Sequence, residues 1–117
     1  MKDNIGNKVR LNHILEALNE IEDFTKGLTY DDYMKNSMLR HALVRLLEII
    51  GEASNHLTTD LKNEFSDVEW LALKGLRNVL AHEYFGVDYQ LVWNLIVDRV
   101  PELKININNI LIEKFSE

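Results

Sequence analysis

The amino-acid sequence predicts an all-α fold, an up-and-down four-helix bundle with an additional C-terminal helix. Apolar residues recur at spacings of three and four along successive stretches, and the 117 residues include only one Pro and five Gly. No two segments alternate in a way that would let them pair as strands. We expect short connections, which make neighbouring helices antiparallel, and a single domain over residues 1–117 with one hydrophobic core.

Composition narrows the class of protein. Apolar residues make up 46% and charged residues 27%, which is ordinary for a globular protein and excludes a disordered chain. The absence of Cys excludes a disulfide framework and a thiolate metal site. No apolar run approaches the roughly 18 residues of a membrane helix, and the N-terminus lacks a signal-peptide core, so we expect a cytoplasmic protein with no membrane association.

The first two helices are predicted from their apolar stripes. The first should span residues 8–24, and its stripe consists of Leu11, Ile14, Leu15, Leu18 and Ile21. The second should begin after Thr29, a suitable N-cap, and run without a break to about His56. Gly51 inside it, with Ala53 and Ser54, either lets another backbone approach closely or is simply tolerated at a cost of about 1 kcal/mol relative to Ala.

The third helix is expected to begin at a capping box. Residues 57–65 read as a polar connection with a short helical turn after Thr59-Asp60. Ser66 then serves as N-cap and Glu69 reaches back to it. The residues expected to point inward along this helix are Trp70, Leu71, Leu73, Leu76, Val79 and Leu80.

The C-terminal part should contain two helices separated near Pro101. Asp88 can cap a fourth helix through Val97, and Pro101 removes a backbone donor and disfavours helix at Val100. A last helix should restart with Pro101 in its first turn. Residues 105–109 also alternate like a strand, but they have no partner strand, so we predict helix.

One face of the second helix invites a metal interpretation. Glu48, Glu52 and His56 repeat every four residues, yet neither Glu-x-x-His nor His-Glu-x-x-His occurs in the chain. Ion pairing of both glutamates with Arg45 is the better account. The sequence therefore predicts no metal and no cofactor.

Functional chemistry is concentrated in residues 77–84, at the predicted end of the third helix. Asn78 and His82 are four apart on one helical face, and Arg77 and Tyr84 are seven apart on another. Arg77 and His82 are roughly 140° apart on an ideal helix, so both can reach one substrate only if the helix loosens or ends near His82. Gly86 supplies such an ending.

An Arg and a His together can cleave RNA without a metal. The His can transfer the proton of the 2′-hydroxyl or of the leaving group, and the Arg can stabilise the pentacoordinate phosphate. In an arbitrary helical protein, however, the pair would more often be a surface Arg and a His that caps helix carbonyls. The net charge of -6 also opposes a broad nucleic-acid surface, so any RNA contact should be local, unless the acidic surface faces a protein partner.

The context of these residues resembles a known family. Gly75-Leu76-Arg77-Asn78 followed by residues 81–88 is similar to the R-x4-H-x-Y motif of the HepT-like ribonuclease toxins, which belong to the HEPN domains. Residues 47–53, Trp70, Val92-Trp93 and residues 100–103 also resemble the family, in the same order. This resemblance covers essentially the whole chain and implies a HEPN-like bundle.

The resemblance also implies an activity. It makes the chain a metal-independent endoribonuclease toxin of a type VII (HepT/MntA) toxin–antitoxin system, a homodimer that cleaves RNA, with tRNA as the expected substrate. His82 would be the acid/base, Arg77 the phosphate-binding residue and Asn78 a positioning residue. A minimal nucleotidyltransferase antitoxin of the MntA kind would attach AMP to Tyr84, and the added negative charge would repel RNA. Glu83 stands where several relatives have a small residue, which could lower activity.

Two other interpretations stay open from the sequence. The acidic bundle could be a non-catalytic binding partner, or substrate-presenting subunit, of a minimal nucleotidyltransferase. It could also be a dimeric helical protein whose motif only caps a helix. Replacement of His82 by Ala separates the nuclease from these two, because only a nuclease would lose cleavage.

Overall fold

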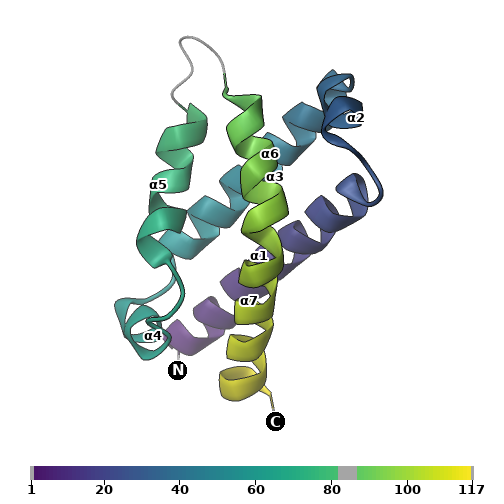
Figure 1. Ribbon diagram of the computed structural model, residues 1–117. Helices are drawn as coiled ribbons and strands as arrows, with labels where there is room; N and C mark the ends of the chain where they lie inside the picture. The colour runs from purple at the N-terminus through teal and green to yellow at the C-terminus, as the bar shows by residue number, and fades with distance from the viewer. Residues whose placement is uncertain (1, 82–86, 117) are drawn as a thin grey trace.

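In the computed structural model, the described residues 2–81 and 87–116 form helices and connecting turns, and no strand is present among them. For residues 2, 3, 77–79 and 81 only the backbone is described. The helices are α1 (Lys2–Thr25), α2 (Tyr30–Met34), α3 (Ser37–Asn55), α4 (Thr59–Glu64), α5 (Trp70–Ala81), α6 (Tyr89–Asp98) and α7 (Val100–Phe115) (Figure 1). The predicted all-α, HEPN-like bundle is confirmed, with α1, α3, α5 and α6 as the main helices and α7 as the additional one. No helix in the described part of the chain is long and apolar enough to cross a membrane.

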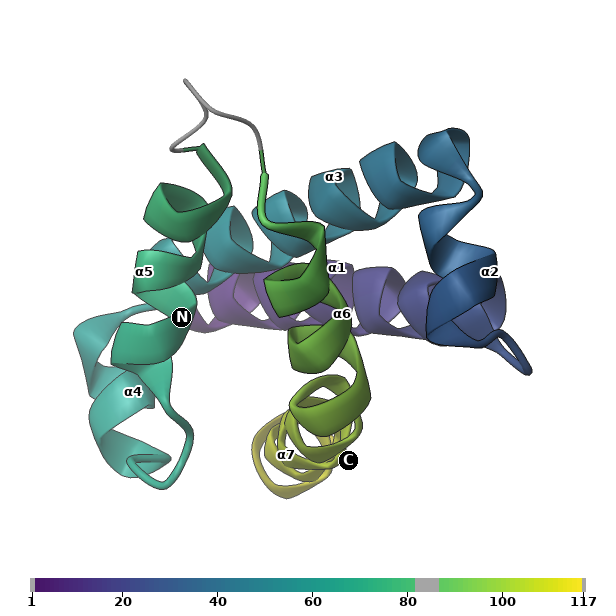
Figure 2. The same cartoon turned by 45° about the horizontal axis from the view of Figure 1, so that its top comes forward.

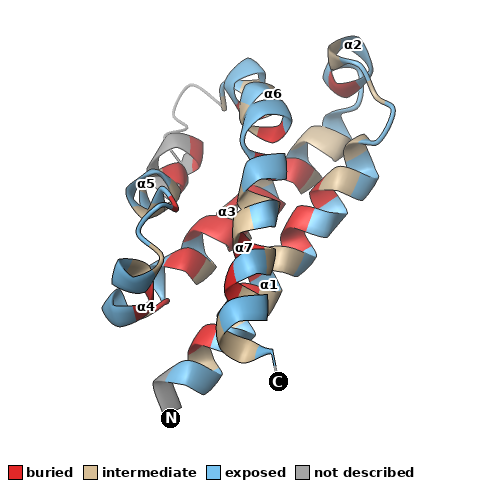
Figure 3. Cartoon of the chain, turned by 60° about the horizontal axis from the view of Figure 1, so that its bottom comes forward, coloured by how far each residue is buried: buried red, intermediate tan, exposed pale blue. Residues whose placement is uncertain are grey.

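Helix α1 packs along α3 and forms the centre of the molecule. Both helices carry buried residues along their length (Figure 3). The predicted stripe of α1 is confirmed for Leu11, Ile14, Leu18 and Ile21, which are fully buried, whereas Leu15 is only partly buried. The start of α1 was predicted too late, at residue 8 instead of Lys2.

A buried polar contact accounts for the longer α1. The Asn7 side chain is only 2% exposed, its Nδ2 donates to Thr58 Oγ1 at 3.0 Å, and its Oδ1 accepts from the Thr58 backbone N–H at 3.1 Å. The first turns of α1 are thus held against the start of α4. Hydrophobic periodicity could not reveal this contact, because the anchoring residue is polar.

The continuous second helix predicted over residues 29–56 is wrong, because the chain breaks at Lys35-Asn36 into α2 and α3. The predicted cap at Thr29 is confirmed as a capping box with Asp32. The break follows from a second cap, since Asn36 Oδ1 accepts from the Leu39 N–H at 3.0 Å. Asn competes for backbone donors in this way and so favours a new helix start over a helix interior.

The capping box predicted at Ser66 is also wrong. Helix α5 begins at Trp70, and its first helical hydrogen bond runs from the Leu73 N–H to the Glu69 carbonyl. Before it, the chain turns through Phe65, whose carbonyl accepts from the Val68 N–H and from Trp70 Nε1 at 3.0 Å. Leu71 is 84% exposed where we expected it inside, because on a helix it lies opposite the buried Leu80.

The remaining boundaries agree with the sequence to within two residues, but the expectation that Pro101 disfavours helix at Val100 is wrong, because α7 begins at Val100. The short turn after residue 58 is α4, capped by Thr58. Asp88 Oδ1 accepts from the Leu91 N–H at 3.1 Å and caps α6. Helix α6 ends at Asp98, and α7 restarts at Val100 with Pro101 in its first turn. The two helices follow one another with a bend (Figure 2).

Candidate functional site

Helix α5 carries the first half of the motif. Arg77 and Asn78 lie between the buried residues Leu76 and Leu80, within the length of α5 that packs on α3. This packing fixes the backbone of both positions on a rigid element. His82 and Tyr84, together with Glu83 and the helix end expected at Gly86, lie outside the described residues. The structure therefore places Arg77 and Asn78 on one helix and does not test how the four motif residues meet.

The two helices that flank the motif have their motif-side ends at the same end of the bundle. The C-terminal end of α5 and the N-terminal end of α6 lie there together in both Figure 1 and Figure 2. The start of α6 is fixed by the Asp88 cap. It is fixed further by Tyr33, whose hydroxyl donates to the Tyr89 carbonyl at 2.7 Å. Residues on both sides of the motif are thus held by packed helices.

An aromatic cluster supports this end of α6. The Tyr33 side chain is fully buried, and its ring centroid lies 4.8 Å from that of Trp93 and 6.0 Å from that of Tyr30. Burial raises the pKa of Tyr33 well above its usual value, so the phenol remains a hydrogen-bond donor over the whole neutral range. The cluster thus keeps the Tyr89 carbonyl in place.

Arg40, His41 and Tyr89 form a second group at this end that was missed from the sequence. The Arg40 guanidinium lies over the Tyr89 ring, with Cζ 4.9 Å from the centroid, and the His41 ring centroid is 6.4 Å away. An Arg-His pair at the start of an apolar helix was the signal available in the sequence. The ring that it meets could not be found from the sequence, because Tyr89 belongs to a different helix.

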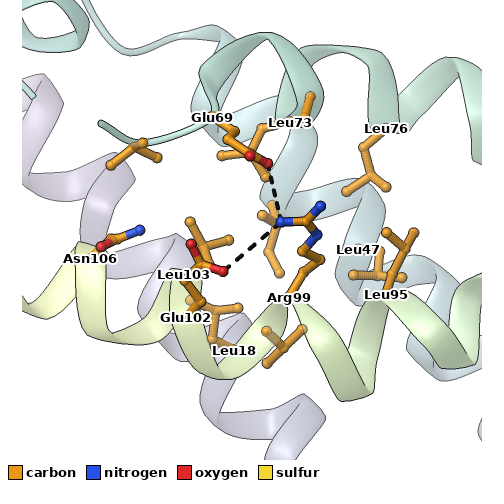
Figure 4. Close-up of a pocket in the computed structure, with 14 residues that line it drawn as sticks. Leu18, Leu47, Glu69, Leu73, Leu76, Leu95, Arg99, Glu102, Leu103 and Asn106 are labelled. Atoms are coloured by element: carbon orange, nitrogen blue, oxygen red, sulfur yellow. Dashed lines mark ion pairs between the residues drawn. The ribbon is translucent and has the colours of Figure 1, made fainter. Parts of the chain in front are cut away.

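An apolar hollow lies beside the first turns of α5. It has a volume of about 220 Å³ and lies between the N-terminal half of α5 and the α6–α7 junction, with Leu18, Leu47 and Leu73 in its walls (Figure 4). At its mouth, Arg99 Nη1 is 3.6 Å from Glu69 Oε2 and 4.0 Å from Glu102 Oε2. These side chains are more than half exposed, so the ion pairs add little stability.

The helix face that carries Glu48, Glu52 and His56 does not form a metal site in the described residues. Arg45 Nη1 lies 4.0 Å from Glu48 Oε1, which confirms one predicted ion pair. The predicted ion pair of Arg45 with Glu52 is wrong, because the two side chains do not form an ion pair in the described part of the chain. Glu52 and His56 instead line an open hollow beside α1. Across residues 2–81 and 87–116, no group of three or more His, Asp or Glu side chains is arranged to hold a metal ion.

Comparison with known proteins identifies relatives over most of the chain. A family model described as "Ribonuclease HepT-like" matches residues 14–110. "Putative RNase MJ1380" of Methanocaldococcus jannaschii is 44% identical over 97 residues, which is 83% of this chain and 89% of the relative. "Putative RNase TTE0752" of Caldanaerobacter subterraneus is 40% identical over 101 residues, 86% and 90% of the two chains. "Probable ribonuclease HepT" of Thermococcus cleftensis is 36% identical over 99 residues, 85% and 90% of the two chains. No solved structure matches.

Proposed function

Because this chain belongs to the HepT-like ribonuclease family, we propose that it is a metal-independent endoribonuclease whose active residues are Arg77, Asn78 and His82. One observation carries the proposal. The family match runs from residue 14 to residue 110 and so contains the complete R-x4-H-x-Y motif, with every motif position occupied by the expected residue. Relatives named as RNases at 36 to 44% identity support the same activity.

The proposed reaction needs only the chemistry of these side chains. His82 accepts the proton of a ribose 2′-hydroxyl, whose oxygen attacks the adjacent phosphorus. The bond from phosphorus to the 5′-oxygen breaks, and that oxygen takes up a proton from the protonated His82 and leaves as a hydroxyl, which returns His82 to its neutral form. Arg77 stabilises the extra negative charge of the pentacoordinate phosphate, and Asn78 positions the reacting groups. The products are an RNA end with a 2′,3′-cyclic phosphate and an RNA end with a free 5′-hydroxyl.

The fold suits this role at the two positions it describes. A catalytic group must be held within a fraction of an ångström of its working position, and a packed helix does this better than a loop. Positions 77 and 78 lie on α5, which Leu76 and Leu80 anchor to the core. The chain carries a net charge of -6, so we propose that RNA is held locally at this end, in a homodimer in which two motifs face each other.

The proposal extends to control of the enzyme. As a toxin, it would be neutralised by a minimal nucleotidyltransferase that transfers AMP to the hydroxyl of Tyr84. Each AMP unit adds a phosphodiester charge two residues from His82. Negative charge beside Arg77 weakens binding of the RNA phosphate by direct repulsion and by competition for the guanidinium. Transfer RNA is the substrate we would test first.

The test is cleavage of total tRNA in the presence of EDTA by purified, unmodified protein. We expect cleavage that His82→Ala lacks, whereas His13→Ala, which removes an exposed histidine from α1, should cleave at the wild-type rate. An intact-mass spectrum of the isolated protein should show additions in units of AMP where the antitoxin is co-expressed. Unmodified protein that cleaves none of the RNAs tried would refute the nuclease and favour a binding partner of a nucleotidyltransferase.

A further inference from the structure

Tyr89 presents a half-buried aromatic ring at the end of the bundle where the motif segment rejoins the described chain. It is the first residue of α6 and follows the Asp88 cap. The Arg40 guanidinium and the His41 imidazole of α3 lie beside the ring, at the distances given above. Two basic side chains and an aromatic ring thus converge from two helices.

The position of Tyr89 is fixed before any ligand arrives. Its carbonyl accepts from the buried Tyr33 hydroxyl at 2.7 Å. Arg40, which lies over the ring, is itself held because its Nη1 donates to the carbonyls of Tyr33 and Met34 at the end of α2. A ring held in this way loses little conformational freedom when another planar group stacks on it, so less of the contact energy is lost on binding.

His41 offers a polar atom next to the ring. Its Nδ1 lies 2.7 Å from the Ser37 carbonyl oxygen, and because a carbonyl can only accept, this nitrogen carries the proton. Nε2 is then an acceptor in the neutral ring and a donor in the protonated ring. The side chain is exposed, so Nε2 is accessible to a ligand.

The surrounding charge permits an anionic ligand. Asp88 is the nearest acid in sequence, and its Oδ1 is occupied by the Leu91 N–H in the helix cap. Arg40 contributes a permanent positive charge under the ring. Unpaired RNA bases are typically bound by stacking on aromatic side chains, with Arg cations nearby to favour the phosphates.

We propose that Tyr89, His41 and Arg40 form a subsite that stacks one unpaired base of the RNA substrate close to the cleaved bond. Tyr89 is the platform, His41 Nε2 contacts the base or its ribose, and Arg40 is the fixed positive charge. This proposal rests on the proposed function, since it assumes that RNA is bound beside the motif. Tyr89 follows His82 by seven residues, so their Cα atoms are at most about 25 Å apart and one RNA strand can reach both.

Binding is best measured without cleavage. In a His82→Ala background, a short single-stranded RNA containing 2-aminopurine reports stacking through its fluorescence and affinity through anisotropy. Loss of one stacking contact should raise the Kd of Tyr89→Leu by roughly 5- to 150-fold. Tyr89→Phe keeps the ring and should stay within about twofold. His41→Ala should raise the Kd by about 2- to 10-fold, as expected for one hydrogen bond.

Matched controls separate the subsite from general effects. His13→Ala removes an exposed histidine of α1 and should leave the Kd unchanged. For fully paired RNA, which offers no unpaired base, the Kd of Tyr89→Leu should equal that of the protein with Tyr89. In otherwise wild-type enzyme, Tyr89→Leu should raise KM more than it lowers kcat. His41 is exposed, so its variant tests the subsite even where Tyr89→Leu fails to fold.

The outcomes distinguish this subsite from the proposed function. If the wild-type protein cleaves RNA while Tyr89→Leu and His41→Ala bind and cleave as it does, the subsite is refuted and the nuclease stands. If the wild-type protein cleaves nothing but Tyr89→Leu weakens RNA binding and 2-aminopurine stacking, the nuclease is refuted, and Tyr89 is supported as a site that binds an RNA base but not as part of an active site. Equal loss of affinity in Tyr89→Leu and Tyr89→Phe would exclude stacking and overturn the proposal.

Discussion

Replacing Asn7 with Ala should destabilise the fold although no apolar contact is removed. The change deletes two hydrogen bonds to Thr58, at 3.0 and 3.1 Å, each worth about 1 kcal/mol. Ala improves the helix propensity of α1 by about 0.6 kcal/mol relative to Asn. Thr58 is only partly buried, so water can replace part of the lost contact. The net loss should be about 1 kcal/mol, or about 4 °C in Tm for a domain of this size.

The assay is urea unfolding followed by circular dichroism at 222 nm. Asn7→Ala should lower the midpoint without changing the slope, because the surface exposed on unfolding is nearly the same. Asn19→Ala, at an exposed position of the same helix, is the matched control and should be neutral or slightly stabilising. Equal midpoints for Asn7→Ala and Asn19→Ala would refute the idea that this contact anchors the start of α1.

Two further predictions concern titratable groups near the motif end. Burial raises the pKa of Tyr33 above the ordinary value of 10.0, so the stability that this side chain confers should be complete below pH 10 and be lost as the pH rises further. Tyr33→Phe should lower the free energy of unfolding by about 1 kcal/mol. In pH-dependent thermal unfolding, the variant should also lack the loss of stability at alkaline pH. The Thr29 backbone and hydroxyl hydrogen bonds lower the pKa of Asp32 below 3.8, so its contribution should be present above pH 3.8 and be lost as the pH falls through the lowered value. A carboxyl NMR titration of Asp32 in wild type and in Thr29→Val tests this, since the variant should titrate at higher pH, and identical curves would contradict the capping box.

Local patterns sufficed for most helices and caps. The stripe of α1, the caps at Thr29 and Asp88 and the restart at Pro101 each depend on residues within about four positions of one another, which is the range that periodicity and capping rules cover. The errors at Asn36 and Ser66 have different causes. Asn36 interrupted an apolar pattern that continues across it, and the turn at Phe65 displaced the start of α5.

In the candidate site, too, the sequence could single out residues that are close in the chain but not residues that only the fold brings together. The motif residues Arg77, Asn78, His82 and Tyr84 are close in the chain, so the sequence alone could single them out and indicate a family. Their mutual geometry stays a prediction, because His82 and Tyr84 lie outside the described residues. Arg40 and His41 could not be associated with Tyr89 from the sequence, because no local rule relates α3 to α6.

The amino-acid sequence by itself therefore determines most of the helices, most of their caps and the chemistry of the motif, since each depends on residues close together along the backbone. Tertiary packing determines which polar residues become anchors. Asn7 meets Thr58 across 51 positions, and the Tyr33 hydroxyl meets the Tyr89 carbonyl across 56. Such contacts form only when burial of the apolar side chains has brought the helices together, because a single hydrogen bond is too weak to bring distant segments together against chain entropy.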